Sequence, residues 1–223
     1  MTFIPTLDEG KRRPRIPRTL DPVEIRVLGS LMEKQLTTPE YYPLTLNALA
    51  AAANQKSNRE PVMELGDAEL QRALDRLQDE KLTWKVLGGR AVRYDHNLEP
   101  VWHLNRKEKA LLTLLFLRGP QTSGELRGRS DRLQQFDSVA EVEEVLRDMA
   151  AHSEPLVTQL PRRPGQKEER WAHLVGGAVI DDAPDAPVVE SRGEPLSARV
   201  QKLEEQVAML AGELRELKAK LGE

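Results

Sequence analysis

The chain repeats one arrangement of basic, apolar and β-rich residues at an interval of 72 to 74 residues. A basic tetrapeptide, three apolar residues at helical spacing and a following leucine each return with their residue type preserved. The matched positions are Lys56-Ser57-Asn58-Arg59, Leu70, Leu74, Leu77 and Leu82 in the first copy, and Arg129-Ser130-Asp131-Arg132, Val142, Leu146, Met149 and Leu156 in the second. Near-constant spacing of this kind is typical of a duplicated structural unit. The sequence therefore predicts two copies of one small module.

The first copy begins with a predicted helix, a connector and a second, shorter helix. Asp21-Pro22 starts the first helix, with Asp as the N-cap and Pro at the first helical position. Two prolines in residues 37–43 prevent that helix from continuing. Residues 44–53 are rich in alanine and predict a small helix that neighbouring helices can approach closely. Residues 61–65 are short and could pair as an edge strand.

A longer helix and a β-hairpin complete the first copy. Asp67 is a candidate cap for this helix, and its predicted buried stripe is Leu70, Ala73, Leu74 and Leu77. Leu82 to Tyr94 then predicts a hairpin with strands TWKV and AVRY. Its turn is expected at Gly88-Gly89, because both glycines accept positive φ. Three helices followed by such a hairpin are typical of a winged-helix module.

The second copy repeats this order with a longer turn in its hairpin. Asn105 can cap a helix that Gly119-Pro120 ends, and a short helix over residues 123–127 follows. A basic loop over residues 127–132 precedes a helix capped by Ser138. Residues 156–160 and 170–174 then predict two strands.

The predicted fold class is mainly α with small β wings (α+β), built as two tandem winged-helix domains plus a C-terminal coiled-coil helix. Residues 1–20 hold three prolines and five basic residues and predict a basic flexible tail. The alternative for this tail is an arm that follows a DNA minor groove or its phosphates. We expect winged-helix domain 1 over residues 21–104, domain 2 over 105–176, a linker over 177–193 and the coiled-coil helix over 194–223.

The C-terminal residues follow a strict heptad pattern. Apolar residues alternate at spacings of four and three, at Leu196, Val200, Leu203, Val207, Leu210, Leu214, Leu217 and Leu221. This seam predicts a coiled coil and therefore a homodimer, and β-branched valine at a positions with leucine at every d position favours a parallel pair. The flanking charges satisfy parallel and antiparallel pairs alike, so the orientation stays open. The alternative is one amphipathic helix that folds back on its own chain.

Composition favours a protein of the cytoplasm that does not enter a membrane. The chain has no cysteine, which fits a reducing compartment. It has no signal-peptide-like apolar region and no uninterrupted apolar run of about 18 residues. Apolar residues make up 39% of the chain and aromatic residues only 4%, so the core has to be built from Leu, Val and Ala. The net charge of −3 argues against a protein coated in basic surface.

With these residues in view, the chain resembles the bacterial UPF0502 (YceH-like, DUF480) family over roughly residues 20–177. The segments that carry the resemblance are LMEKQLTTPEYYPLTLNALAAAANQKSNREPVM (31–63), LNRKEKALLTLLFLRGPQTSGELRGRSDRLQQF (104–136) and LPRRPGQKEERWAHLVGG (160–177). The resemblance implies tandem winged-helix domains, in agreement with the pattern above. It implies no mechanism, because the biochemical role of that family is uncharacterised.

Residues that enzymes use for catalysis are absent or scattered. The four histidines are His96, His103, His152 and His173, and they form no metal-ligand spacing with carboxylates. No GxSxG, P-loop or dinucleotide fingerprint occurs, and Gly88-Gly89 lacks the following helix that would bind a phosphate. We therefore expect a protein that is not an enzyme and that needs no cofactor or metal.

Association with double-stranded DNA is the leading functional hypothesis. A winged helix can place its third helix in the major groove and its wing on the backbone, and in the first copy Gln71, Arg72 and Arg76 could read base edges. The remaining basic and polar candidates could contact phosphates. The full set is Lys56, Asn58, Arg59, Gln71, Arg72, Arg76, Lys85, Arg90, Arg93, Arg127, Arg129, Arg132, Arg162, Arg163 and Lys167.

The competing hypothesis is a dimeric protein-interaction scaffold that uses its winged-helix surfaces without binding DNA. The third helix of the second copy is acidic, with Glu141, Glu143, Glu144 and Asp148 against one arginine, Arg147. Such a face is repelled by phosphates, and we expect that it does not insert into a major groove. Fold alone does not decide between the two hypotheses, because function resides in the exposed site.

Overall fold

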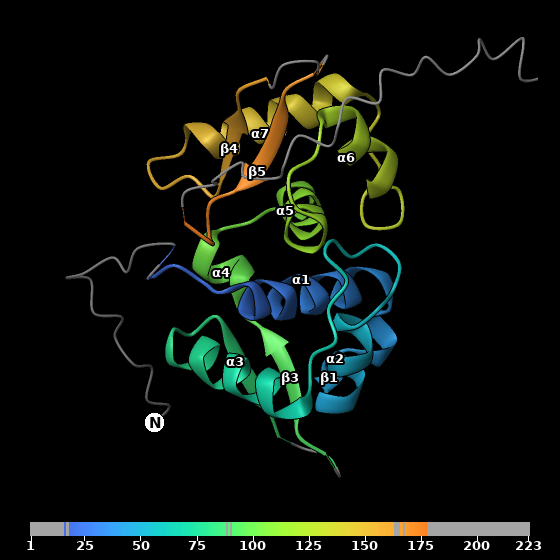
Figure 1. Cartoon of the computed structure of the whole chain (residues 1–223), viewed down its shortest axis with the longest axis vertical. Coiled ribbons are helices and arrows are strands. Elements are labelled where there is room, and N and C mark those ends of the chain that lie inside the picture. The colour runs from blue at the N-terminus through green and yellow to red at the C-terminus, as the bar shows by residue number, and fades with distance from the viewer. Residues whose placement is uncertain are drawn as a thin grey trace, which may run out of the picture. The chain divides into compact units, whose positions relative to one another are not determined.

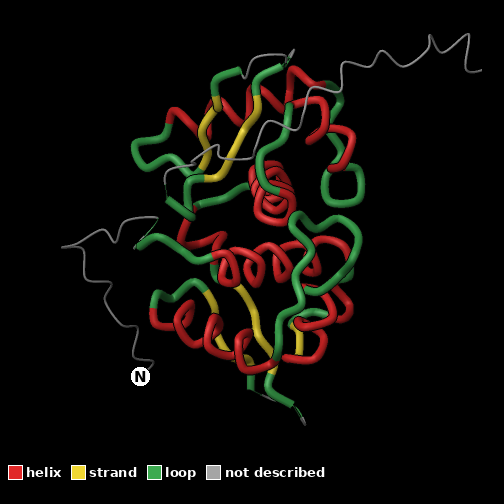
Figure 2. Tube along the Cα trace, in the orientation of Figure 1, coloured by secondary structure: helices red, strands yellow, loops and turns green. Residues whose placement is uncertain are grey.

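The protein is mainly α-helical with two small antiparallel sheets, which confirms the predicted α+β class (Figure 2). The computed structural model describes residues 16, 18–87, 89, 91–162, 166 and 168–177. All of these belong to one compact unit, residues 1–180. Each half of this unit has the winged-helix-like order of three helices followed by a hairpin. Residues 178–193 of the predicted linker and the heptad seam from Leu196 to Leu221 lie outside the described residues, so the coiled coil stays a prediction.

Helix α1 (Pro22–Thr37) begins at the expected cap. The Asp21 carboxylate accepts a hydrogen bond from the Glu24 N–H at 2.9 Å, and the Glu24 carboxylate accepts one from the Asp21 N–H at 2.8 Å. This reciprocal capping box satisfies N–H groups that a helix start would otherwise leave unpaired. A short 3₁₀ helix, η1 (Pro39–Tyr41), follows at the proline-containing connector.

The predicted small helix is preceded by a strand that the sequence did not indicate. Leu44–Thr45 forms β1 and pairs antiparallel with β3, so helix α2 covers only Leu46–Ala53. The predicted edge strand over residues 61–65 is wrong, because that segment forms no β ladder. Its backbone is held by side chains instead: Asn54 donates to the Leu65 carbonyl at 2.9 Å and accepts from its N–H at 2.8 Å.

Helix α3 (Asp67–Asp79) buries the predicted stripe of Leu70, Ala73, Leu74 and Leu77. Its N-cap is Gly66 rather than Asp67, and Glu69 closes the first turn by accepting from the Gly66 N–H at 3.0 Å. Strand β2 (Thr83–Val86) matches the predicted first strand, but β3 covers Arg93–His96, two residues later than expected. The sheet order is β1-β3-β2. Gly88, half of the predicted turn, lies outside the described residues.

A short helix, α4 (Leu98–Trp102), links the halves, and α5 (Arg106–Arg118) follows with Asn105 and Glu108 forming the predicted cap. Helix α6 covers Ser123–Ser130, so most of the predicted basic loop is helical. The helix continues because Leu126 and Ser130 are buried on its inner face. Helix α7 (Val139–Ala151) starts at Ser138, and β4 (Val157–Leu160) pairs antiparallel with β5 (Arg170–His173).

The two halves share one continuous hydrophobic core. Helices α1 and α5 pack directly on each other; in Figure 1, α1 runs across the view and α5 is seen along its axis above it. Gly29 of α1 gives room for this contact, because a Cβ there would lie 2.9 Å from Leu117 Cδ2. Two backbone hydrogen bonds also join the halves, from Leu20 to Val175 and from Glu60 to Leu117, each at 2.8 Å. The division at residues 104 and 105 stays a prediction.

Candidate functional site

The outward face of α3 lies directly beside the β2–β3 hairpin. Tyr94 on β3 donates from its hydroxyl to Gln71 Oε1 at 2.8 Å. Lys85 on β2 lies with Nζ 3.4 Å from Asp75 Oδ1. These contacts join helix and hairpin into one surface through Gln71 and Asp75, and Arg72 is exposed on the same helix.

Most cations of this surface already have partners within the chain. Arg76 forms an ion pair with Asp21 and places Nε 3.0 Å from the buried carboxylate of Glu24. Arg93 donates to the Pro43 carbonyl at 2.7 Å. Arg72 is exposed and makes no hydrogen bond or ion pair with any residue in the described ranges.

Arg76 has a structural role because of the environment of Glu24. Burial alone would raise the pKa of Glu24, but the Arg18 guanidinium, which lies 2.7 Å from its carboxylate, and the Asp21 N–H hold that pKa below its ordinary value. Arg76 adds a second positive charge. Arg18, which the sequence assigned to a flexible tail, therefore forms an ion pair with the first turn of α1. Its guanidinium also lies 3.3 Å from the carboxylate of Glu80.

The structure buries one of the predicted phosphate contacts. Arg59 makes two hydrogen bonds with Glu33, at 3.1 and 2.6 Å, and also donates to the Ala52 carbonyl. Its guanidinium therefore closes the interior side of the loop and is not presented to a ligand. Lys56 and Asn58 of the same loop are exposed, and Asn58 accepts a hydrogen bond from Arg118 at 2.8 Å.

The second copy distributes its candidates over α6, the following turn and the second hairpin. Arg127 is half-buried, and Arg129 donates to Gln121 at 2.7 Å and to Glu125 at 3.0 Å. Arg132 and Arg162 are exposed. Arg90, Arg163 and Lys167 lie outside the described residues.

The exposed side of α7 is acidic, as the sequence indicated. Glu144 and Asp148 are exposed, Glu143 pairs with Arg147 at 2.6 Å, and Glu141 pairs with Lys107. The single arginine of this face is therefore already neutralised by an acid one turn away.

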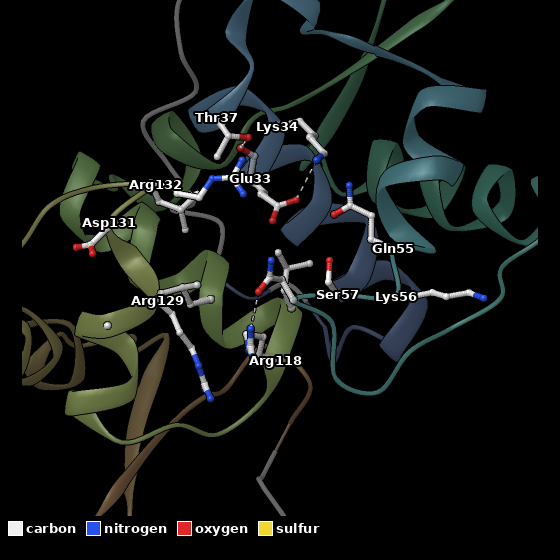
Figure 3. Close-up of a pocket in the computed structure, with 15 residues that line it drawn as sticks. Glu33, Lys34, Thr37, Gln55, Lys56, Ser57, Arg118, Arg129, Asp131 and Arg132 are labelled. Atoms are coloured by element: carbon white, nitrogen blue, oxygen red, sulfur yellow. Dashed lines mark hydrogen bonds and ion pairs between the residues drawn. The ribbon is translucent and has the colours of Figure 1, made fainter. Parts of the chain in front are cut away.

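The repeated basic tetrapeptides face one cleft. A cavity of about 780 Å³ is lined on one side by the end of α1 and the loop after α2, and on the other by the end of α5, α6 and the turn after it. Figure 3 shows Gln55, Lys56 and Ser57 opposite Arg129, Asp131 and Arg132. We call this cavity the inter-repeat cleft.

The inter-repeat cleft collects positive charge. Its lining includes five basic side chains, Lys34, Lys56, Arg118, Arg129 and Arg132, and two acidic ones, Glu33 and Asp131. Glu33 is already neutralised by Arg59 and lies 3.5 Å from Lys34. Arg132 extends across the view toward Thr37 and Glu33, whereas Asp131 extends away from the centre (Figure 3).

Arg118 is a half-buried cation of the cleft. Its Nε is buried and has no hydrogen-bond partner in the part of the chain that the structure describes. Burial lowers the pKa of Arg118, and the nearby guanidinium of Arg129 lowers it further. Nothing in the sequence marks Arg118 or Lys34 as a candidate, because each lies near a helix end outside any motif.

The described residues contain no group of three or more His, Asp or Glu side chains arranged to hold a metal ion. None of the described helices combines the length and the apolar character needed to cross a bilayer.

Comparisons with known proteins identify relatives along nearly the whole chain. A family model described as "Protein of unknown function, DUF480" matches residues 20–166. A UPF0502 protein of Geobacter metallireducens is 53% identical over 183 residues, which cover 82% of this chain and 81% of the relative. A UPF0502 protein of Azoarcus is 44% identical over 216 residues, 96% of each chain, and one of Opitutus terrae is 46% identical over 198 residues, 86% of this chain and 83% of the relative. The chain belongs to the UPF0502 (DUF480) family, whose function is unknown.

Proposed function

We propose that the chain is a non-enzymatic, DNA-associated regulatory protein that acts as a dimer through its C-terminal helix. The observation that carries this proposal is the single surface formed by α3 and the β2–β3 hairpin, which Tyr94–Gln71 and Lys85–Asp75 tie together. In winged-helix proteins such a helix lies in the major groove while the hairpin contacts the backbone. Arg72 is an exposed cation of the same helix.

Internal ion pairs on this surface do not prevent contact with phosphates. Lys85 and Asp75 are both exposed, and an exposed ion pair contributes only about 0–1 kcal/mol to stability. Lys85 can therefore exchange its carboxylate partner for a phosphate at small cost. The acidic α7 face supports the expectation that only the first copy enters the groove.

The test is binding of a fluorescent random duplex of about 20 base pairs, followed by anisotropy at several salt concentrations. With about six phosphate contacts, affinity should fall by orders of magnitude between about 50 and 200 mM salt. Arg72→Ala should weaken binding. Arg147→Ala on α7 is the matched control and should bind as the unchanged protein does. No measurable binding at low salt would refute the proposal.

The β2–β3 hairpin favours a second candidate, a protein-interaction scaffold. Trp84, Leu87 and Val92 are 45%, 77% and 42% exposed at this hairpin. Exposed aromatic and aliphatic residues that lie close together are typical of protein-binding surfaces. If the hairpin serves a protein partner, Trp84→Ala should leave duplex binding unchanged. A loss of duplex affinity as large as that of Arg72→Ala would instead assign Trp84 to the DNA surface.

Dimerisation has its own test, independent of DNA. Leu203→Asp combined with Leu210→Asp places two charges in the predicted seam. Light scattering should then give the mass of one chain, with the circular dichroism of the globular part retained. An unchanged mass would contradict the predicted coiled coil.

A further inference from the structure

Five cations and two acids line the inter-repeat cleft; Arg129 also pairs with Glu125, and Lys56 extends away from the centre (Figure 3). Of the two acidic residues that line it, Glu33 is shared by Arg59 and Lys34, and Asp131 extends outward. Arg132 is exposed and makes no hydrogen bond or ion pair with any residue that the structure describes. Like charges gathered in this way repel one another, so an anion placed between them is favoured.

Arg118 adds a donor that the chain leaves unused. One of its terminal nitrogens donates to Asn58, but Nε is buried and finds no partner in the described part of the chain. A buried donor without an acceptor is costly unless a ligand or water satisfies it. The planar guanidinium presents its donors in a fixed fork that matches phosphate oxygens.

The size and the walls of the cleft limit what can enter. About 780 Å³ is within the range of small-ligand sites and holds much more than a single phosphate. Leu114, Leu117 and Leu133 supply an apolar part of the lining. The cleft therefore combines a cationic side with a wall for a carbon-rich group.

We propose that the inter-repeat cleft binds a small phosphorylated ligand, with the phosphate held by Arg118, Arg132 and Lys34. The organic part of the ligand lies toward the three leucines. Both repeated tetrapeptides contribute, Lys56 and Asn58 from the first and Arg129 and Arg132 from the second. This inference does not depend on DNA binding by α3, since it concerns different residues.

Calorimetric titration of the full chain with pyrophosphate, at constant ionic strength in a phosphate-free buffer, tests the proposal. We expect one site per chain. Arg132→Ala should weaken binding at least about tenfold, because it removes charge-assisted hydrogen bonds to the phosphate. Arg132 is exposed, so the fold should be kept, which circular dichroism verifies. Arg147→Ala is the matched control and should leave the affinity unchanged.

Amide chemical shifts locate the site in the same titration. Perturbations concentrated in residues 33–37, 55–58, 117–118 and 128–133 are expected. Absence of binding, equal losses in Arg132→Ala and Arg147→Ala, or perturbations elsewhere would overturn the proposal. The proposal would also be overturned if duplex DNA displaced pyrophosphate and if Arg132→Ala weakened the binding of duplex and pyrophosphate equally. The cleft would then be a nucleic-acid phosphate site. Arg72→Ala separates this inference from the proposed function, since it should weaken the binding of duplex DNA and leave the affinity for pyrophosphate unchanged.

Discussion

Lowering the pH from 7 to 5 should destabilise this protein through two histidines that the fold keeps neutral. His96 is buried, accepts at Nδ1 from the Leu98 N–H at 3.3 Å and lies with Nε2 2.9 Å from Gln35 Oε1. A proton added at Nδ1 would point at the Leu98 N–H, which is itself a donor, so the hydrogen bond would be lost. Burial, with the charge of Lys109 nearby, lowers the pKa of His96 to about 4, although Asp95 and Glu99 act in the opposite direction.

His173 adds a second effect of the same sign. Its ring packs edge-on against Phe116 with 5.2 Å between centroids, and its Nδ1 is buried without a hydrogen-bond partner among the described residues. Burial lowers the pKa of His173 to about 4 as well. In the unfolded chain each histidine binds a proton near its ordinary pKa of 6.5. The unfolded state therefore holds more protons between these values, and stability present above pH 6.5 is lost as the pH falls toward 4.

The magnitude follows from the two pKa values. A group that shifts from 6.5 to about 4 removes about 2 kcal/mol from the free energy of unfolding at pH 5, so both histidines together remove about 4 kcal/mol. The carboxylates Glu24 and Glu141 also have lowered pKa values, but their contribution is lost only below their ordinary 4.5. Most of the change between pH 6.5 and 5 therefore comes from the histidines.

Urea denaturation followed by tryptophan fluorescence at pH 7, 6 and 5 measures this effect. His96→Asn keeps an acceptor for the Leu98 N–H and should roughly halve the loss of unfolding free energy over that interval. His103→Asn, at an exposed position, is the matched control and should keep the dependence of the unchanged chain. The comparison uses the change of the unfolding free energy with pH, so a destabilisation that is the same at every pH does not affect it. An unaltered slope in His96→Asn would refute the assignment.

Three further substitutions test the packing. Arg59→Met should lower the unfolding free energy by about 3 kcal/mol, because it leaves the Glu33 carboxylate and the Ala52 carbonyl without their donor. The control Lys56→Met should change the unfolding free energy by no more than about 0.5 kcal/mol. Urea denaturation measures both values. Asp21→Ala removes the α1 cap and should cost about 1–2 kcal/mol in the same assay. Gly29→Val forces a Cβ to within 2.9 Å of Leu117 Cδ2 and 3.0 Å of Phe116 Cβ. We therefore expect the unfolding free energy to fall by about 2 kcal/mol and the midpoint of thermal unfolding to be lower. An unchanged midpoint would mean that α1 and α5 separate easily.

The features that the sequence predicted correctly are those with local causes. The caps at Asp21, Asn105 and Ser138 depend on side chains within three residues of the helix start, so residue order alone identifies them. The buried stripe of α3 follows from the helical period. Hairpins were recognisable because each has two β-rich segments around a turn.

Features set by distant contacts could not be predicted in this way. Leu44–Thr45 has no strand pattern of its own and becomes β1 only because β3, about 50 residues later, lies alongside it. Arg59 belongs to a polar segment that resembles a solvated loop, yet Glu33 on α1 draws its guanidinium inside. The α6 boundary was misplaced because two arginines and a glycine suggested a loop, while the buried Leu126 and Ser130 decided the structure.

The inter-repeat cleft depends on packing that brings the two copies together. Either loop alone would expose its basic residues to water, where their charges are screened within about 8–10 Å. Packing of α1 against α5 brings both loops to one cavity and partly buries Arg118 beside it. An anion that binds only this packed form would stabilise it by mass action. The proposed site therefore needs no residue that a catalytic or metal-binding motif would mark, because packing alone brings its two loops to one cavity.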